Sequence, residues 1–151
     1  MVCLGNICRS PLAEGILKNK TQNLDVFVDS AGTSSFHVGN PPDSRSIEIA
    51  SKNGIDLTDQ RARQFSEKDF HNFDKIYAMD TNNYSHIISL AKDQSDRDKV
   101  DVILNVLNSK SYDSVPDPYY GAGDGFQIVY DLLNSACDAI VGKLWTKESY
   151  I

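Results

Sequence analysis

The chain has 151 residues, 40% of them hydrophobic and 24% charged, a composition typical of one globular domain that buries a core. Because 21 Asp and Glu outnumber 15 Lys and Arg, the net charge of -6 argues against duplex binding, and we expect no nucleic-acid partner. No apolar run approaches the roughly 18 residues of a membrane span, and 3 cysteines are too few for a disulfide framework, so we expect a cytoplasmic protein with reduced thiols.

The first predicted helix begins at Ser10. Serine is a good N-cap, and Pro11 at the first helical position has no amide hydrogen that would go unpaired. The alternating run 25–29 follows and predicts a strand. A second helix is predicted over 43–53, where Asp43 serves as the N-cap and a glycine follows the last residue.

A third helix is predicted to start after Ser66. Asp69 stands three residues further on, which is the capping-box spacing with Asp in place of the usual Glu. Phe65 and Phe70 are placed to form a hydrophobic staple, which fixes the direction in which the chain enters the helix.

The second half of the chain continues the alternation of strands and helices. Strands are predicted at 75–79 and 100–104 and helices at 81–91 and 123–146, while the charge-rich segment 93–101 is typical of a solvated loop. The last helix has one apolar stripe, formed by Phe126, Val129, Leu133, Ala136 or Cys137, Ile140 and Leu144. Core packing is therefore the expected role of the Cys137 thiol.

Strands that alternate with helices predict the α/β class. We expect a single domain over 1–151, with a four-stranded, mostly parallel sheet and helices on both faces. In such sheets ligands bind at the carboxyl ends of strands, near helix N-termini. The segment 3–10 falls at this position, so it is the expected site.

The segment 3–10 reads CLGNICRS. A short loop that wraps around a point aims successive backbone N–H groups inward, and the helix start adds the positive end of its dipole. Arg9 can clamp two oxygens of a phosphoryl group with its planar fork. Gly5 and Asn6 tolerate unusual backbone angles. The same field favours a thiolate at Cys3, to which Ser10 adds a hydrogen bond, so Cys3 is the predicted nucleophile.

At these residues the sequence resembles the low-molecular-weight protein tyrosine phosphatases. Residues 2–11 (VCLGNICRSP) match that family's signature loop along its length. Three later segments match in the right order: 29–33, 78–80 and 117–120. In the first of them Ser30 resembles the serine that supports the loop asparagine, and the last resembles the segment with the general acid. The likeness covers nearly the whole chain.

The resemblance implies a two-step hydrolysis of phosphotyrosine and aryl phosphates that needs no metal or cofactor. Cys3 attacks phosphorus and forms a cysteinyl-phosphate, while Asp117 gives a proton to the leaving phenol oxygen and later activates water. Arg9 and the loop amides hold the phosphate oxygens. The two prolines beside Asp117 also restrict its backbone. The partner implied is a phosphotyrosine-containing protein, and we expect a monomer or weak dimer.

The resemblance also implies a set of binding and supporting residues. The predicted substrate- and phosphate-binding residues are Leu4, Gly5, Asn6, Ile7, Cys8, Ser10, Phe36, Tyr119 and Tyr120. The predicted loop-supporting residues are Asn6, Ser10 and Ser30. The histidines show no metal-ligand spacing and are expected to be surface or structural residues: His37, His71 and His86.

Two positions depart from the family's pattern. Only Met1 and Val2 precede Cys3, so the first strand is expected to be truncated. Gln60 stands where many relatives have a histidine, so the supporting role of that histidine is either absent or taken by Gln60.

Two other functions stay open. One is an arsenate reductase of the same fold, although its thioredoxin-linked form needs two further redox cysteines and this chain has only Cys137 beyond the loop. The other is a catalytically impaired relative that binds phosphotyrosine without hydrolysing it.

Overall fold

The computed structural model of the protein describes residues 1–107, 113–119, 121 and 123–148. In chain order its elements are β1 (Val2–Cys3), α1 (Arg9–Lys20), β2 (Ala31–Gly32), α2 (Ser44–Lys52), α3 (Asp69–Asn72), β3 (Ile76–Ala78), α4 (Thr81–Leu90), α5 (Gln94–Asp98), β4 (Val100–Val102), the 3-10 turn η1 (Ile103–Val106) and α6 (Gly125–Glu148). No helix among the described residues is long and apolar enough to cross a membrane.

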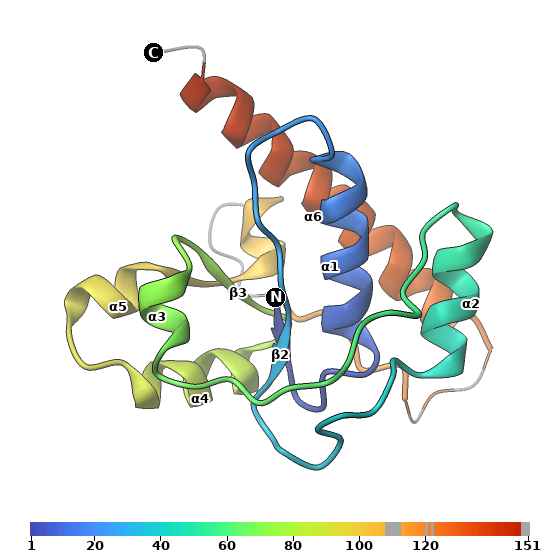
Figure 1. The fold of residues 1–151 in the computed structure, drawn as a ribbon, viewed down its shortest axis with the longest axis horizontal. Helices are drawn as coiled ribbons and strands as arrows, with labels where there is room; N and C mark the ends of the chain where they lie inside the picture. Colours follow the sequence, from blue (N-terminus) through green and yellow to red (C-terminus); the bar gives the residue numbers. More distant parts are fainter. Residues whose placement is uncertain (108–112, 120, 122, 149–151) are drawn as a thin grey trace.

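The strands form one sheet in the order β2-β1-β3-β4, and each pair of neighbours is parallel. In Figure 1 the helices α1, α2 and α6 gather on one side of this sheet and α3, α4 and α5 on the other. The predicted α/β class and the four-stranded parallel sheet with helices on both faces are therefore confirmed. The predicted strands at 75–79 and 100–104 correspond to β3 and β4.

Side chains alternate between two hydrophobic clusters on the two faces of the sheet. Val2, Ile76 and Ala78 belong to one cluster, whereas Cys3 and Met79 belong to the other. This alternation is the period of a strand that is covered on both faces. The carboxyl end of β1 thus places the Cys3 thiol at the edge of a core, directly before the loop that leads into α1.

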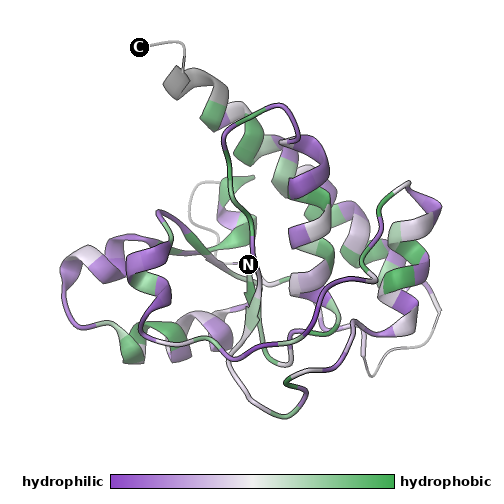
Figure 2. Cartoon of the chain, in the orientation of Figure 1, coloured by the Kyte–Doolittle hydropathy of each residue, from purple (hydrophilic) through white to green (hydrophobic). Residues whose placement is uncertain are grey.

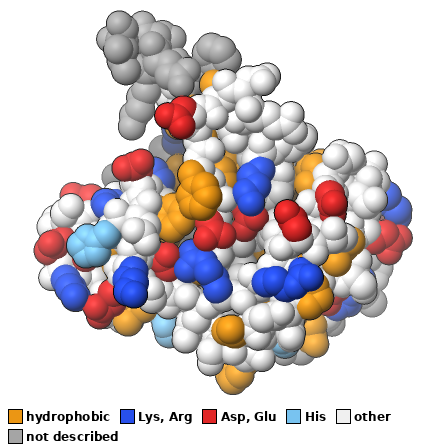
Figure 3. All heavy atoms as spheres, in the orientation of Figure 1, with side chains coloured by type: hydrophobic (Ala, Val, Ile, Leu, Met, Phe, Trp, Pro, Cys, Tyr) orange, Lys and Arg blue, Asp and Glu red, His pale blue; other side chains and the backbone are white. Residues whose placement is uncertain are grey.

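The long helix α6 covers the cluster to which Cys3 belongs. Its predicted apolar stripe is confirmed: Val129, Leu133, Ala136, Cys137 and Ile140 are buried. Figure 2 shows hydrophobic and hydrophilic residues alternating along this helix. On the face of the molecule that Figure 3 shows, acidic and basic side chains are interspersed.

The predicted signals of two short helices are present. The Asp43 carboxylate caps α2 by accepting from Arg45 N (2.9 Å), as predicted. The rings of Phe65 and Phe70 meet edge to face at 5.4 Å, which confirms the staple. Ser66 N donates to Asp69 Oδ2 (2.9 Å), so half of the capping box forms, although α3 itself begins only at Asp69.

The predicted N-cap at Ser10 was wrong. The helix α1 begins at Arg9, and Cys8 occupies the N-cap position without a side-chain cap. Ser10 lies inside the first turn because its hydroxyl is used elsewhere, within 3.0 Å of Cys3 Sγ and 2.8 Å of Asn6 Nδ2.

Two further predictions of local structure were wrong. The run 25–29 is not a strand, although Asp29 O accepts a hydrogen bond from Met1 N (3.1 Å). The strand β2 lies further on, at Ala31–Gly32. Within the expected loop 93–101, residues 94–98 form α5, which Asp93 caps by accepting from Asp96 N (2.9 Å).

Candidate active site

The loop between β1 and α1 bends back on itself around the Cys3 thiol. Asn6 has a φ of +56°, the left-handed conformation predicted for it, and its backbone N–H donates to Cys3 Sγ (3.2 Å). Gly5 does not adopt a positive φ, so the unusual backbone angle expected there is absent. The position favours glycine for lack of space, because a Cβ atom there would lie 3.0 Å from His37 Cδ2.

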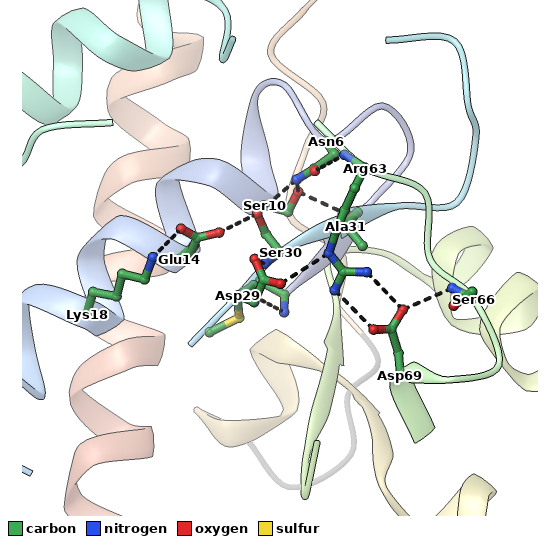
Figure 4. A network of polar contacts seen from close by, with 11 residues as sticks. Asn6, Ser10, Glu14, Lys18, Asp29, Ser30, Ala31, Arg63, Ser66 and Asp69 are labelled. Carbon is green, nitrogen blue, oxygen red and sulfur yellow. Dashed lines mark hydrogen bonds and ion pairs between the residues drawn. The ribbon is translucent and has the colours of Figure 1, made fainter. Parts of the chain in front are cut away.

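The Asn6 side chain is held from three directions (Figure 4). Its Nδ2 donates to Ser10 Oγ (2.8 Å) and to Ser30 Oγ (2.9 Å), and its Oδ1 accepts from Arg63 N (3.1 Å). Both amide hydrogens and the carbonyl oxygen are therefore used, which fixes the loop at its turning point. The structure thus brings together the three predicted loop-supporting residues, and Arg63 is an addition.

Gln60 does not take part in this contact. Its Nε2 donates to Pro11 O (3.1 Å) at the start of α1, while Arg63 supplies the backbone donor for Asn6. The supporting role considered for Gln60 is therefore directed at the helix and not at the loop asparagine.

A buried carboxylate sets the direction of the hydrogen bonds that end on Cys3. Ser30 Oγ donates to Glu14 Oε1 (2.7 Å), so Ser30 must accept from Asn6. Both amide hydrogens of Asn6 are then used, and Ser10 also accepts. The hydroxyl hydrogen of Ser10 is left for Cys3 Sγ at 3.0 Å, a nearer acceptor than Ala31 O at 3.5 Å. Two donors, the Ser10 hydroxyl and the Asn6 N–H, are therefore aimed at the sulfur.

Sequence reasoning missed Glu14. Its pairing with Lys18 at the i,i+4 spacing is typical of an exposed helix surface, yet the glutamate side chain is only 4% exposed while the lysine is 52% exposed. The ion pair at 2.7 Å compensates the buried charge, and nothing local in the sequence distinguishes it from a surface pair.

Arg9 is buried at the other side of the loop. Its NH1 donates to Asp80 Oδ2 (2.7 Å) and to Val115 O (3.0 Å), and its NH2 lies 3.8 Å from Asp117 Oδ2. Asp80 is itself fixed, since it caps α4 by accepting from Asn83 N (2.7 Å). The guanidinium is therefore locked in one orientation, and the two acids come from segments far from Arg9 in the sequence.

One pocket of about 200 Å³ brings most of the predicted residues together. It is lined by Cys3, Leu4, Gly5, Ile7, Cys8, Arg9, Ser34, Phe36, His37, Asp117 and Tyr119. Ser34 and His37 were not predicted to line it, and no motif marks either of them. Tyr120 lies outside the described residues. Leu4, Phe36 and Tyr119 are exposed at the rim (48%, 83% and 41%), so their apolar surfaces can stack on a flat aryl group.

The cysteine environments differ in a way that alkylation can measure. Burial raises the pKa of Cys8 to about 12, with Asp43 the next cause, and burial also raises the pKa of Cys137 to about 12. Both thiols are neutral near pH 7, so they react slowly, since the thiolate is the nucleophile. We expect iodoacetamide under reducing conditions to modify Cys3 first, as mass spectrometry of peptides would show. Orthophosphate should protect Cys3. Preferential modification of Cys8 would contradict this assignment.

Two substitutions of Asn6 separate backbone strain from hydrogen bonding. Asn6→Ala and Asn6→Gly both remove the side-chain amide, but only alanine resists the left-handed φ. We expect Asn6→Ala to be less stable than Asn6→Gly by about 1 kcal/mol in urea unfolding, with activity reduced in both. Equal stabilities would show that the φ of Asn6 stores no strain.

The whole chain is similar to one group of proteins. The family model described as low molecular weight phosphotyrosine protein phosphatase matches residues 1–149. The low molecular weight phosphotyrosine protein phosphatase of Schizosaccharomyces pombe is 44% identical over 134 residues, which cover 85% of each chain. The crystal structure of a protein tyrosine phosphatase from Entamoeba histolytica has a TM-score of 0.89 and 39% identity, and the match covers 97% of this chain and 96% of that one. A structure described as drosophila arginine phosphatase has a TM-score of 0.83 and 33% identity, with 95% and 94% covered.

Proposed function

This chain belongs to the low molecular weight phosphotyrosine protein phosphatase family and is a protein tyrosine phosphatase, and from this premise we propose that Cys3, Arg9 and Asp117 carry its reaction. The observation that supports the assignment is their convergence. A thiol, a locked guanidinium and a carboxyl line the same pocket, although Asp117 is more than a hundred residues away in the sequence.

In the first step the Cys3 thiolate attacks phosphorus. The S–P bond forms as the bond from phosphorus to the aryl oxygen breaks, and Asp117 gives its proton to that oxygen. Arg9 holds phosphate oxygens while charge develops on them. In the second step water attacks the cysteinyl-phosphate, Asp117 takes a proton from that water, and orthophosphate leaves as the thiolate is restored.

The supporting residues act on the nucleophile Cys3 and on the phosphate-binding Arg9. Ser10 and Asn6 N–H both donate to Cys3 Sγ (3.0 and 3.2 Å), which stabilises the thiolate as nucleophile and as leaving group. Asp80 orients Arg9 through the 2.7 Å ion pair. We assign phosphate binding to the loop from Leu4 to Cys8 and the aryl wall to Leu4, Phe36 and the tyrosines 119 and 120.

We further propose that the substrate is a phosphotyrosine-containing protein. The exposed apolar rim suits a phenyl ring better than the short side chain of phosphoserine. The excess of acidic residues supports the absence of a nucleic-acid partner, and the composition supports a cytoplasmic location. A monomer or a weak dimer is the proposed oligomeric state.

The test compares four classes of substrate at mildly acid pH: aryl phosphates, phosphoserine, phosphoarginine and arsenate. We expect the protein to release orthophosphate from a phosphotyrosine peptide and from p-nitrophenyl phosphate, and much more slowly from phosphoserine. Phosphoarginine is the third arm, because one structural neighbour is described as an arginine phosphatase. Arsenate with thioredoxin is the fourth, and the burial of Cys137 against Ala13 O in the core argues against turnover there. Tight binding of the phosphotyrosine peptide without hydrolysis would favour the impaired relative instead.

A further inference from the structure

The first turn of α2 is attached to the phosphate-binding loop at two carbonyl groups. Asp43 N donates to Ile7 O (2.8 Å), and the buried Ser46 hydroxyl donates to Cys8 O (3.3 Å). These contacts fix the position of α2 relative to the loop that surrounds Cys3. A side chain from the same turn is therefore a fixed point from which other parts of the site can be held.

Arg45 is the side chain that this turn presents. The Asp43 carboxylate holds its guanidinium in a bidentate pair, with Oδ1 accepting from Nε (3.0 Å) and Oδ2 from NH2 (3.0 Å). Such a pair fixes the plane of the guanidinium as well as its position. Hydrogen bonding from the Arg45 side chain, the largest influence, lowers the pKa of Asp43, so the pair stays charged at mildly acid pH.

The fixed guanidinium reaches the segment that contains Asp117. It lies over the ring of Tyr119 at 5.5 Å and over the ring of Phe126, at the start of α6, at 4.7 Å. Its NH1 and NH2 also make long hydrogen bonds to Tyr119 O, at 3.5 and 3.4 Å. Figure 1 shows the start of α6 beside α2. Arg45 therefore contacts one residue shortly after Asp117 and one residue in the first turn of α6.

Tyr119 links Arg45 to Asp117, because it contacts both residues. The Tyr119 backbone N–H donates to Asp117 Oδ1 (3.0 Å), while the carbonyl and ring of the same residue contact Arg45. The carboxyl itself is exposed and lies in an irregular segment, so neighbouring contacts must fix its place. An error of about 1 Å in such a group can cost about 100-fold in rate.

We propose that Arg45 is a positioning residue that holds Asp117 over the phosphate-binding loop through Tyr119. The proposal rests on the proposed function, in which Asp117 is the general acid. A merely structural arginine would affect all substrates alike. A positioning arginine affects most those substrates whose leaving groups need the proton, because the contribution of a general acid grows as the leaving group becomes poorer.

The experiment measures kcat/KM of Arg45→Gln for a series of aryl phosphates, from p-nitrophenyl phosphate to phenyl phosphate. We expect a loss of about 10-fold for phenyl phosphate, a smaller loss for p-nitrophenyl phosphate and thus a steeper dependence on leaving-group pKa. Arg45→Lys should recover part of the loss. The inhibition constant of orthophosphate should not change, since the loop is intact. Arg61→Gln is the matched control, because Arg61 is exposed and donates only to Thr58 O and Gln60 O in the bonds described.

A double-mutant cycle with Asp117→Asn tests the positioning role of Arg45 separately from the general-acid role of Asp117. If Arg45 acts through Asp117, Arg45→Gln has no further effect on phenyl phosphate cleavage in the Asp117→Asn background. A full additional loss there, or an equal loss for every leaving group, overturns the role of Arg45 while the role of Asp117 stands. If Asp117→Asn alone leaves phenyl phosphate cleavage unchanged, the general-acid assignment fails and the role of Arg45 falls with it.

Discussion

Cys3→Ser is expected to lower kcat for p-nitrophenyl phosphate and phosphotyrosine peptides by about 10⁶-fold, to the background rate. A serine hydroxyl stays protonated and is a much weaker nucleophile than a thiolate. The donors that favour a thiolate, Ser10 Oγ at 3.0 Å and Asn6 N at 3.2 Å, point toward the nucleophile and do not accept from it. The S–P intermediate cannot form, so rapid-quench labelling with a phosphorylated substrate should trap no phosphoenzyme.

Two controls make this result specific. The variant should still bind orthophosphate, since Arg9 and the loop amides remain, and its thermal midpoint should stay close to that of the parent protein. Cys137→Ala removes a thiol buried in the core at the α1–α6 contact, and it should retain kcat once the folded fraction is accounted for. Substantial turnover by Cys3→Ser would remove Cys3 from the mechanism.

Asp117→Asn is expected to lower kcat/KM for phenyl phosphate by about 10²–10⁴-fold, because an amide of the same shape cannot donate the proton. The loss should be much smaller for p-nitrophenyl phosphate, whose leaving group needs little protonation. The dependence of kcat/KM on the pKa of the leaving group should therefore be steeper in the variant than in the parent. Initial rates with both substrates measure both effects.

Removal of a charge alone does not explain such a pattern. Asp131→Asn is the matched control, since Asp131 is exposed on α6 and accepts from Gln127 Nε2 (2.9 Å), which an asparagine oxygen can also do. It should behave as the parent protein with both substrates. Equal losses for the two substrates in Asp117→Asn would point to a damaged pocket and away from general-acid catalysis.

The parts of the fold that local patterns specify were predictable. The helix α2 has its own cap in Asp43, and α6 has a long apolar stripe, so each is defined by residues within it. The run 25–29 has a strand pattern, but a strand also needs a paired neighbour, and the pairing with β1 involves Ala31 and Gly32. The five residues of α5 are too short to show a period, although Asp93 marks the start.

The site residues likewise divide into those that a local pattern predicts and those that it does not. The residues from Cys3 to Ser10 are contiguous, so their chemistry could be read from one segment. Asp117 was identified mainly through resemblance, because a lone Asp between prolines is most often a turn residue. Glu14 and Arg45 carry no local signal at all, since their roles exist only after distant segments have packed together.

The alternation of side chains along β1 has a consequence for how the enzyme loses activity on heating. Val2 belongs to one hydrophobic cluster and Cys3 to the other, so the residue that we assign as the nucleophile is anchored between two cores. The thiol cannot leave its position by a local opening of the loop unless both cores loosen with it. Heat inactivation and global unfolding should therefore share one cooperative transition, and hydrogen exchange at the Cys3 amide should be as slow as exchange in the middle of α6.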